Sequence, residues 1–301
     1  MGGGATGGVG GGRAFRGSAL KRSPRGVHLG SWSVFCDIAG QVSQSPANPV
    51  VTVAAVGIAA EVVHDARRRL LRRFDGRTVK WKSGAAAGFA QIAALATTLR
   101  TPICIYQVHS DGTRWAEFYR QALSFHQEAK EKTGKPLAFL DGDEVMRMSL
   151  FGEVFAELVG RLLRARQPWP DVPATIDLQL IVDTDLRSAE TREHFKWALL
   201  EWARTSRVRT ELGVSLNMAG RVETEQAEPL LLLPDYVAGV YQHADPRTRL
   251  GDPVVTPEEA TALVHDLRRR LGDLLFEIPL EFQQEYPLEH REGKVVERRD
   301  V

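Results

Sequence analysis

The sequence predicts an α/β protein with a mixed β-sheet flanked by helices, and three observations lead to that prediction. Short apolar runs rich in β-branched residues alternate along the chain with longer segments of helical periodicity. Only about a dozen residues, without a helical pattern, separate the first two apolar runs, which indicates an antiparallel pair. Later runs are separated by helical segments and can therefore pair in parallel. The 301 residues, 43% of them hydrophobic, are enough for a large core.

The first 30 residues are predicted to be a disordered tail, because glycines followed by basic side chains cannot form a core. Order is expected from about Ser31, in one domain that ends near residue 278. Residues 32–37 (WSVFCD) and 49–58 (PVVTVAAVGI) are predicted strands. The next segment, residues 59–74, repeats its apolar residues every three or four positions and is a predicted amphipathic helix.

The middle of the chain is expected to contain a helix, a strand and a helical insertion. TVKWKS, residues 78–83, is expected to form a short strand or a loop. Ser83 is the expected N-cap of an almost uncharged, and therefore buried, helix that ends at Arg100. Residues 102–110 (PICIYQVHS) are a predicted third strand, and residues 113–170 are the expected helical insertion.

The remaining elements are predicted with the same rules. Residues 174–185 alternate apolar and polar side chains and are the clearest strand, and GVSLNMAG (213–220) is a shorter one. Helices are expected at 188–204, from Pro234, and after Thr256, with serine, proline and threonine at their starts. Residues 279–301 are expected to be a loose charged tail.

Composition excludes several classes of protein. The formal net charge is +1, from 39 basic and 38 acidic residues, so no global field attracts polyanions. The two cysteines, Cys36 and Cys104, are predicted to be buried, and two thiols do not make a disulfide-built scaffold. No apolar run has the length of a transmembrane helix, and no signal peptide is evident. We therefore expect a cytoplasmic protein with no membrane partner.

One octapeptide occurs twice with a single difference. VHDARRRL (63–70) and VHDLRRRL (264–271) differ only at their fourth position. Their flanks show no similarity, so we interpret the pair as two arginine-rich amphipathic helices rather than a duplication. Arginines in such helices are expected on a solvated face.

Candidate chemistry rests on acids at the ends of predicted elements. The sequence contains no Gly-x-Ser-x-Gly, Walker, Cys-x-x-Cys pair or His-Glu-x-x-His motif. Asp37 and Asp183 end predicted strands, Asp185 follows, and Asp235 opens a helix. Hard divalent cations prefer such carboxylates, and pairs of them promote phosphodiester cleavage. Each acid also has a structural interpretation, as a turn former, a cap or a partner of a helix dipole.

Three short motifs, in this order, resemble a known family. They are FCDIAGQ (35–41), QLIVDTD (179–185) and LLLLPDYVAG (230–239). Their succession is similar to that of the bacterial family called domain of unknown function 3800, whose fold is RNase H-like. The resemblance extends from about Ser31 to His243. It implies an RNase H-like mixed sheet flanked by helices, with a helical insertion and an extra C-terminal helix.

The resemblance also implies a function and a set of site residues. Asp37, Asp183 and Asp235 match the presumed metal-binding acids of the family, which implies Mg²⁺ or Mn²⁺ as cofactor. VKWKS is similar to a family segment whose lysine, here Lys80, would face a scissile phosphate. The implied activity is that of a metal-dependent nuclease, a hydrolase with nucleic acid as partner. Lys80 also fits the description of an ordinary exposed lysine.

This sequence departs from the family pattern at four places. Ile38 replaces the second acid, Thr78 replaces a glutamate, and the helix from Ser83 has no acid. The Asp-Ser pair that often precedes the last motif is also not evident. Glu223 or Glu225 could substitute for a missing carboxylate near the last motif. Two functions therefore stay open: a metal-dependent nuclease, or a catalytically degenerate relative that binds nucleic acid or protein.

Overall fold

The computed structural model describes residues 27–43, 47–109, 142–166, 174–184, 214–249 and 254–278, with a few isolated positions between them. The strands are β1 (Val27–Ala39), β2 (Val50–Ala59), β3 (Ile103–His109), β4 (Ala174–Asp183), β5 (Val214–Glu223) and β6 (Leu275–Glu277). The helices are α1 (Ala60–Arg73), α2 (Trp81–Leu99), α4 (Gly142–Arg166), α7 (Leu232–Ala244) and α8 (Pro257–Leu271), with 3₁₀ turns η1 (Pro229–Leu231) and η2 (Gly272–Leu274).

The six strands form one mixed sheet in the order β5-β4-β1-β2-β3-β6. β2 is antiparallel to β1 and β3, whereas β4 is parallel to β1 and β5 is parallel to β4. The fold is thus the RNase H-like α/β fold that the sequence predicts, and the antiparallel pairing of the first two strands is confirmed. The short β6, parallel to β3, was not predicted, because three residues carry no readable periodicity.

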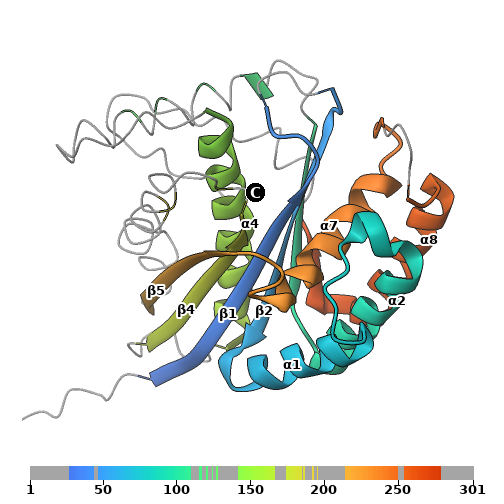
Figure 1. The fold of residues 1–301 in the computed structure, drawn as a ribbon. Helices are drawn as coiled ribbons and strands as arrows, with labels where there is room; N and C mark the ends of the chain where they lie inside the picture. The colour runs from blue at the N-terminus through green and yellow to red at the C-terminus, as the bar shows by residue number, and fades with distance from the viewer. Residues whose placement is uncertain are drawn as a thin grey trace, which may run out of the picture.

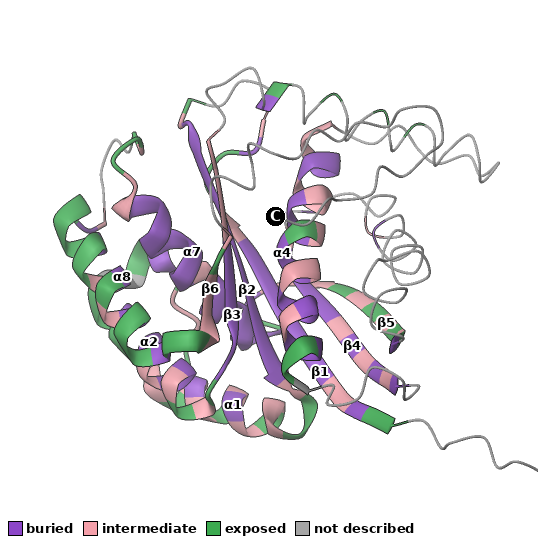
Figure 2. Cartoon of the chain, turned by 180° about the vertical axis from the view of Figure 1, so that it is seen from behind, coloured by how far each residue is buried: buried purple, intermediate pink, exposed green. Residues whose placement is uncertain are grey.

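Helices cover both faces of the sheet (Figure 1). α4 packs on one face, against β1, β2 and β3, while α7 packs on the other, against β1 and β2. α1, α2 and α8 lie on the α7 side. Alternation in β1 separates the two cores, because Val34 and Cys36 belong to the α4 side and Phe35 to the α7 side. The central strands and α7 are almost wholly buried (Figure 2), which agrees with the almost continuously apolar sequence of β2.

Several predicted boundaries differ from the structure at the N-terminus and in the insertion. β1 begins at Val27 rather than near Ser31, so four residues assigned to the tail belong to the strand, and two of them, Val27 and His28, pair with β4. A bulge between His28 and Ser31 interrupts that pairing, and Gly30 adopts a φ of 98°, which favours glycine. α4 lies within the expected insertion but forms one layer of the core. The expected helix at 188–204 and most of residues 113–141 lie outside the described residues, as does the C-terminal tail.

The start of α2 was wrongly predicted. The helix begins at Trp81, two residues before the expected Ser83 cap, and Lys80 takes the N-cap position with extended backbone angles. The expectation that this helix is buried on all sides is also wrong, because Ala86, Ala87 and Gln91 are exposed. Its alanines and glycines carry no charge, yet only one face contacts the core.

The later helices agree with prediction more closely. Thr256 and Glu259 form a reciprocal capping box at the start of α8. α7 begins at Leu232, two residues before the expected Pro234, because η1 leads directly into it. Cys36 and Cys104 are both buried and unbonded, as predicted. Within the described part of the chain, no helix is long and apolar enough to cross a bilayer.

Two glycines allow α2 and α7 to pack closely. A Cβ atom on Gly239 of α7 would lie 2.3 Å from Cδ1 of Trp81, the first residue of α2. In the reverse direction, a Cβ on Gly88 of α2 would lie 2.3 Å from the hydroxyl of Tyr236 in α7. Trp81 and Tyr236 also contact each other edge to face, with ring centroids 5.7 Å apart. Each helix thus places an aromatic ring on a glycine of the other.

We expect Gly239→Ala to lower the free energy of unfolding by about 1–3 kcal/mol, because the buried Trp81 ring has no room to move away. Gly152→Ala in α4 is the matched control, since a Cβ there meets nothing within 4 Å. The control should be neutral or stabilise by up to ~1 kcal/mol. Urea unfolding of both variants measures this, and equal effects would contradict the packing described.

Candidate functional site

Asp37 and Asp183 lie near the ends of two neighbouring parallel strands, on the same face of the sheet. β4 ends at Asp183, whereas β1 continues two residues beyond its predicted end at Asp37, to Ala39. Cys36 of β1 pairs with Val182 of β4, so the next residue on each strand is one of these aspartates. Both side chains are on the α7 side, because side chains alternate and Ile181 belongs to that core. Asp37 is 5% exposed and Asp183 is 6% exposed. The parallel pairing therefore brings together two predicted site residues that are far apart in sequence.

Local hydrogen bonds orient both carboxylates. Oδ1 of Asp37 accepts the N–H of Ile38 at 2.7 Å. Oδ1 of Asp183 accepts the N–H of Thr184 at 2.7 Å and its hydroxyl at 3.1 Å. Asp183 thus accepts hydrogen bonds from the residue that follows β4, in agreement with its structural interpretation. Its other oxygen, Oδ2, faces Lys80.

Lys80 lies opposite these acids, at the residue before α2. Its Nζ is 3.4 Å from Oδ2 of Asp183 and makes an ion pair with Oε1 of Glu225. Burial alone would lower the pKa of Lys80, but the hydrogen bond with Glu225 and the charges of Asp183 and Asp37 raise it above its usual value. Lys80 is therefore a cation among carboxylates; it is exposed, as the alternative interpretation has it, but it is also ion-paired.

Glu225 adds a further buried carboxylate beside Lys80. It lies in the turn after β5, where the N–H groups of Ala227 and Glu228 donate to the carbonyl of Thr224 at 3.0 and 2.8 Å. The residue is 3% exposed. Glu223, the other candidate, pairs in register with Asp183 and so extends the row of acids across β5. Both glutamates were candidates from the sequence, and in the structure it is Glu225 that forms an ion pair with Lys80.

Asp235 joins the site from the first turn of α7. Its Oδ2 accepts the backbone N–H of Trp81 at 2.7 Å, so it satisfies one free donor at the start of α2. Burial raises the pKa of Asp235 to about 6. The Trp81 N–H and Lys80 act against this shift, whereas the charges of Glu225 and Asp183 add to it.

We name these five side chains the acid–lysine cluster: Asp37, Lys80, Asp183, Glu225 and Asp235. All four residues predicted from the sequence belong to it. Asp185, the further candidate, lies outside the described residues. Ile38 packs with the core on the α4 side of the sheet, so its side chain is directed away from the cluster. An acid at position 38 would consequently not face Lys80 on this backbone.

The cluster has the donor chemistry of a hard divalent cation, namely several carboxylate oxygens from separate segments. Within the described part of the chain, however, no three His, Cys, Asp or Glu side chains are arranged to hold a metal ion. The Lys80 ammonium provides the positive charge between Asp183 and Glu225. A metal ion bound by these acids would require the lysine side chain to move aside.

Comparisons with known proteins add one result. No protein-family model matches the chain, and no curated protein matches it. Among solved structures, the chain is similar to the ribonuclease H2 from Pyrococcus horikoshii OT3, with 10% sequence identity and a TM-score of 0.33. The alignment covers 79% of this chain and 99% of that one. The fold assignment depends on the strand order and directions given above, and membership of the domain of unknown function 3800 family stays a prediction.

Asp235→Asn is expected to be more stable than the wild type at pH 8, by up to ~2 kcal/mol, because an amide is not penalised by burial as a carboxylate is. The pKa of Asp235 is higher in the folded protein than the ordinary 3.8, so the wild type gains stability as the pH falls through 6. The difference between the two proteins should thus shrink between pH 6 and pH 4.

Urea unfolding at several pH values, with a chelator present, measures this difference. A variant that is less stable by the same amount at every pH would contradict it. That result would mean that the carboxylate chiefly stabilises α2 through the Trp81 N–H.

Proposed function

We propose that the chain is a divalent-metal-dependent nuclease whose active site is the acid–lysine cluster. The observation that carries this proposal is the convergence of acids from β1, β4, the turn after β5 and α7 on one lysine. Buried carboxylates crowded at the end of a sheet cost stability, and such arrangements are typical of functional sites. The RNase H-like fold agrees with this function but does not by itself establish it.

In this proposal the acids hold the metal and position the substrate. Asp37, Asp183 and Asp235 are the ligands, with Glu225 as a fourth oxygen donor, and the cofactor is Mg²⁺ or Mn²⁺. When bound, the metal supplies Lewis acidity and an activated water for phosphodiester hydrolysis. The N–H groups of Ile38 and Thr184 orient the Asp37 and Asp183 carboxylates through Oδ1. Oδ2 of Asp183 consequently faces the site.

Lys80 has two roles in the proposed site. In the free protein its ammonium neutralises Asp183 and Glu225, so the acids can lie close together without a metal. With substrate present, the ammonium turns toward a non-bridging phosphate oxygen and stabilises the charge that develops there. Its side chain is 49% exposed, which gives it room to make this movement.

A second candidate function is binding without cleavage. The observation that favours it is that Lys80 already pairs with two of the acids in the described structure. A cluster that is satisfied internally can persist as a structural ion-pair network in a degenerate relative. Under this alternative the protein binds nucleic acid or protein, and the carboxylates serve the fold.

Cleavage assays with single- and double-stranded DNA and RNA in Mn²⁺ or Mg²⁺ distinguish the two functions. We expect Asp37→Asn and Asp183→Asn to abolish cleavage, since each removes a proposed metal ligand. Asp177→Asn is the matched control, because Asp177 lies on β4 with a side chain that is 46% exposed. This control should cleave as the wild type does.

Lys80→Ala should lower the cleavage rate by roughly 100-fold or more, since it removes the cation beside the phosphate. Lys82→Ala is its control, since Lys82 is exposed and lies two residues after Lys80, at the second position of α2. Cleavage that survives Asp37→Asn would refute the proposed site. Absence of cleavage, combined with nucleic-acid binding that survives both aspartate substitutions, would favour the binding function.

A further inference from the structure

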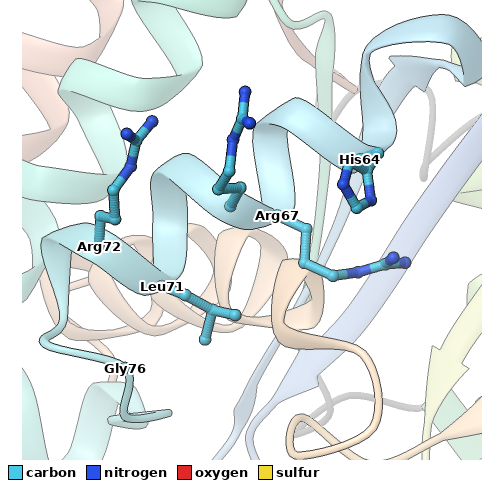
Figure 3. Close-up of a pocket in the computed structure, with 6 residues that line it drawn as sticks. His64, Arg67, Leu71, Arg72 and Gly76 are labelled. Atoms are coloured by element: carbon cyan, nitrogen blue, oxygen red, sulfur yellow. The ribbon is translucent and has the colours of Figure 1, made fainter.

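A groove of about 350 Å³ lies along α1, outside the acid–lysine cluster. Six residues line it: His64, Arg67, Arg68, Leu71, Arg72 and Gly76. Figure 3 shows that the His64, Arg67 and Arg72 side chains leave successive turns of the helix, with Gly76 just beyond its end. Four of the six can carry positive charge and none is acidic. The lining therefore favours an anionic occupant.

The exposed residues of the groove follow one row of the helix surface. His64, Arg68 and Arg72 are each four positions apart on α1, and Gly76 lies four positions further on, in the turn after the helix; all four are exposed. Residues four apart lie on one helix face, about 6 Å from each other along the axis. Successive cationic side chains at this spacing can contact different phosphates of one nucleic-acid strand.

The acids near the groove leave part of its charge uncompensated. Asp65 is shared between Arg68 and Arg69, at 2.6 and 2.5 Å, so one carboxylate serves two guanidinium groups. Arg67 has its own partner, Glu228. Arg72 makes no ion pair with any residue in the described part of the chain. Arg68 and Arg72 are thus the cations most available to a ligand.

The second copy of the octapeptide, in α8, makes the same kinds of ion pair. Asp266 is shared between Arg269 and Arg270, at 2.5 Å each, as Asp65 is in α1. Arg268 binds Glu277 through two nitrogens, as Arg67 binds Glu228.

The residues that follow the two octapeptides differ. The position in question lies two residues after each octapeptide, eight residues after its histidine. That residue is Arg72 in α1, whereas it is Asp273, beyond the end of α8, in the second copy. The row of α1 therefore ends in a cation and the row of α8 ends in an acid.

A single turn connects the groove to the cluster. Residues 224–228 carry Glu225, which binds Lys80, and Glu228, which binds Arg67 at 2.5 Å. Glu228 is 3% exposed, so this bidentate pair fixes the position of α1 relative to the turn. A strand bound in the groove would therefore lie next to the acid–lysine cluster.

We propose that the α1 groove is a binding site for the phosphate backbone of nucleic acid, contacted mainly by Arg68 and Arg72. This inference rests on the proposed nuclease function for the identity of the ligand, because it places the flanking part of the substrate strand on α1. Arg67 is a positioning residue, fixed by Glu228. Leu71 and the aliphatic stems of the arginines add apolar surface beneath the sugar and base edges.

The test is fluorescence anisotropy with labelled single-stranded DNA, single-stranded RNA and duplex DNA, in EDTA so that no cleavage occurs. The α1 variant is Arg68→Gln with Arg72→Gln, and the matched α8 variant is Arg269→Gln with Arg270→Gln. Both variants lose two positive charges, so only the place of the loss differs. We expect the α1 variant to bind roughly tenfold more weakly, with a salt-dependence slope smaller by about two. The α8 variant should bind as the wild type does.

Each other outcome overturns the inference. Equal losses in both variants would indicate unspecific charge attraction, and unchanged binding in the α1 variant would exclude the groove. If polyglutamate competes as well as the oligonucleotides do, the occupant is an acidic protein rather than nucleic acid. Failure of the nuclease proposal can be distinguished from failure of this inference. If the nuclease proposal fails, the wild type shows no metal-dependent cleavage, or Asp183→Asn leaves that cleavage unchanged. The anisotropy result does not depend on cleavage.

Discussion

The contact between the start of α2 and the middle of α7 determines the geometry of the candidate site. Asp235 accepts the first free N–H of α2, from Trp81, and the Trp81 ring lies on Gly239 one turn further along α7. Any side chain at position 239 would push the ring, and with it the start of α2, away from the sheet. Lys80 precedes Trp81 directly, so the same contact fixes the lysine opposite the ends of β1 and β4.

The cluster combines this rigid frame with unfavourable electrostatics. Asp235 is placed where burial and two neighbouring carboxylates raise its pKa, and a single lysine provides the nearest compensating charge. A protein selected only for stability would replace such acids with apolar or amide side chains. A bound cation would offset the loss of stability that these buried carboxylates cause, and a phosphate-bearing ligand would pair with Lys80. Ile38 does not contribute to this electrostatic balance, because its side chain packs on the α4 side of the sheet.

The two octapeptides show how one local sequence serves two different surfaces. In both helices an aspartate is shared between the arginines three and four residues further on. These local pairs need no tertiary information. The forked arginine–glutamate pair that each helix also makes has its glutamate outside the helix. What differs is the distant partner: Glu228 connects α1 to the turn of the cluster, whereas Glu277 connects α8 to β6. The expectation of a solvated arginine face thus describes α8 well and α1 only in part.

The sequence by itself determined the α/β class, the antiparallel β1–β2 pair, the alternation of β4 and the start of α8 at Thr256. All of these depend on neighbours within a few residues, or on a short loop. It also singled out Asp37, Lys80, Asp183 and Asp235, through motif order. The tertiary structure decided what local patterns do not contain. It placed the N-terminus of α2 at Trp81, because a cap from α7 replaces the local cap expected at Ser83. It also selected Glu225 over Glu223 as the partner of Lys80, because the turn after β5 folds back over the ends of the parallel strands.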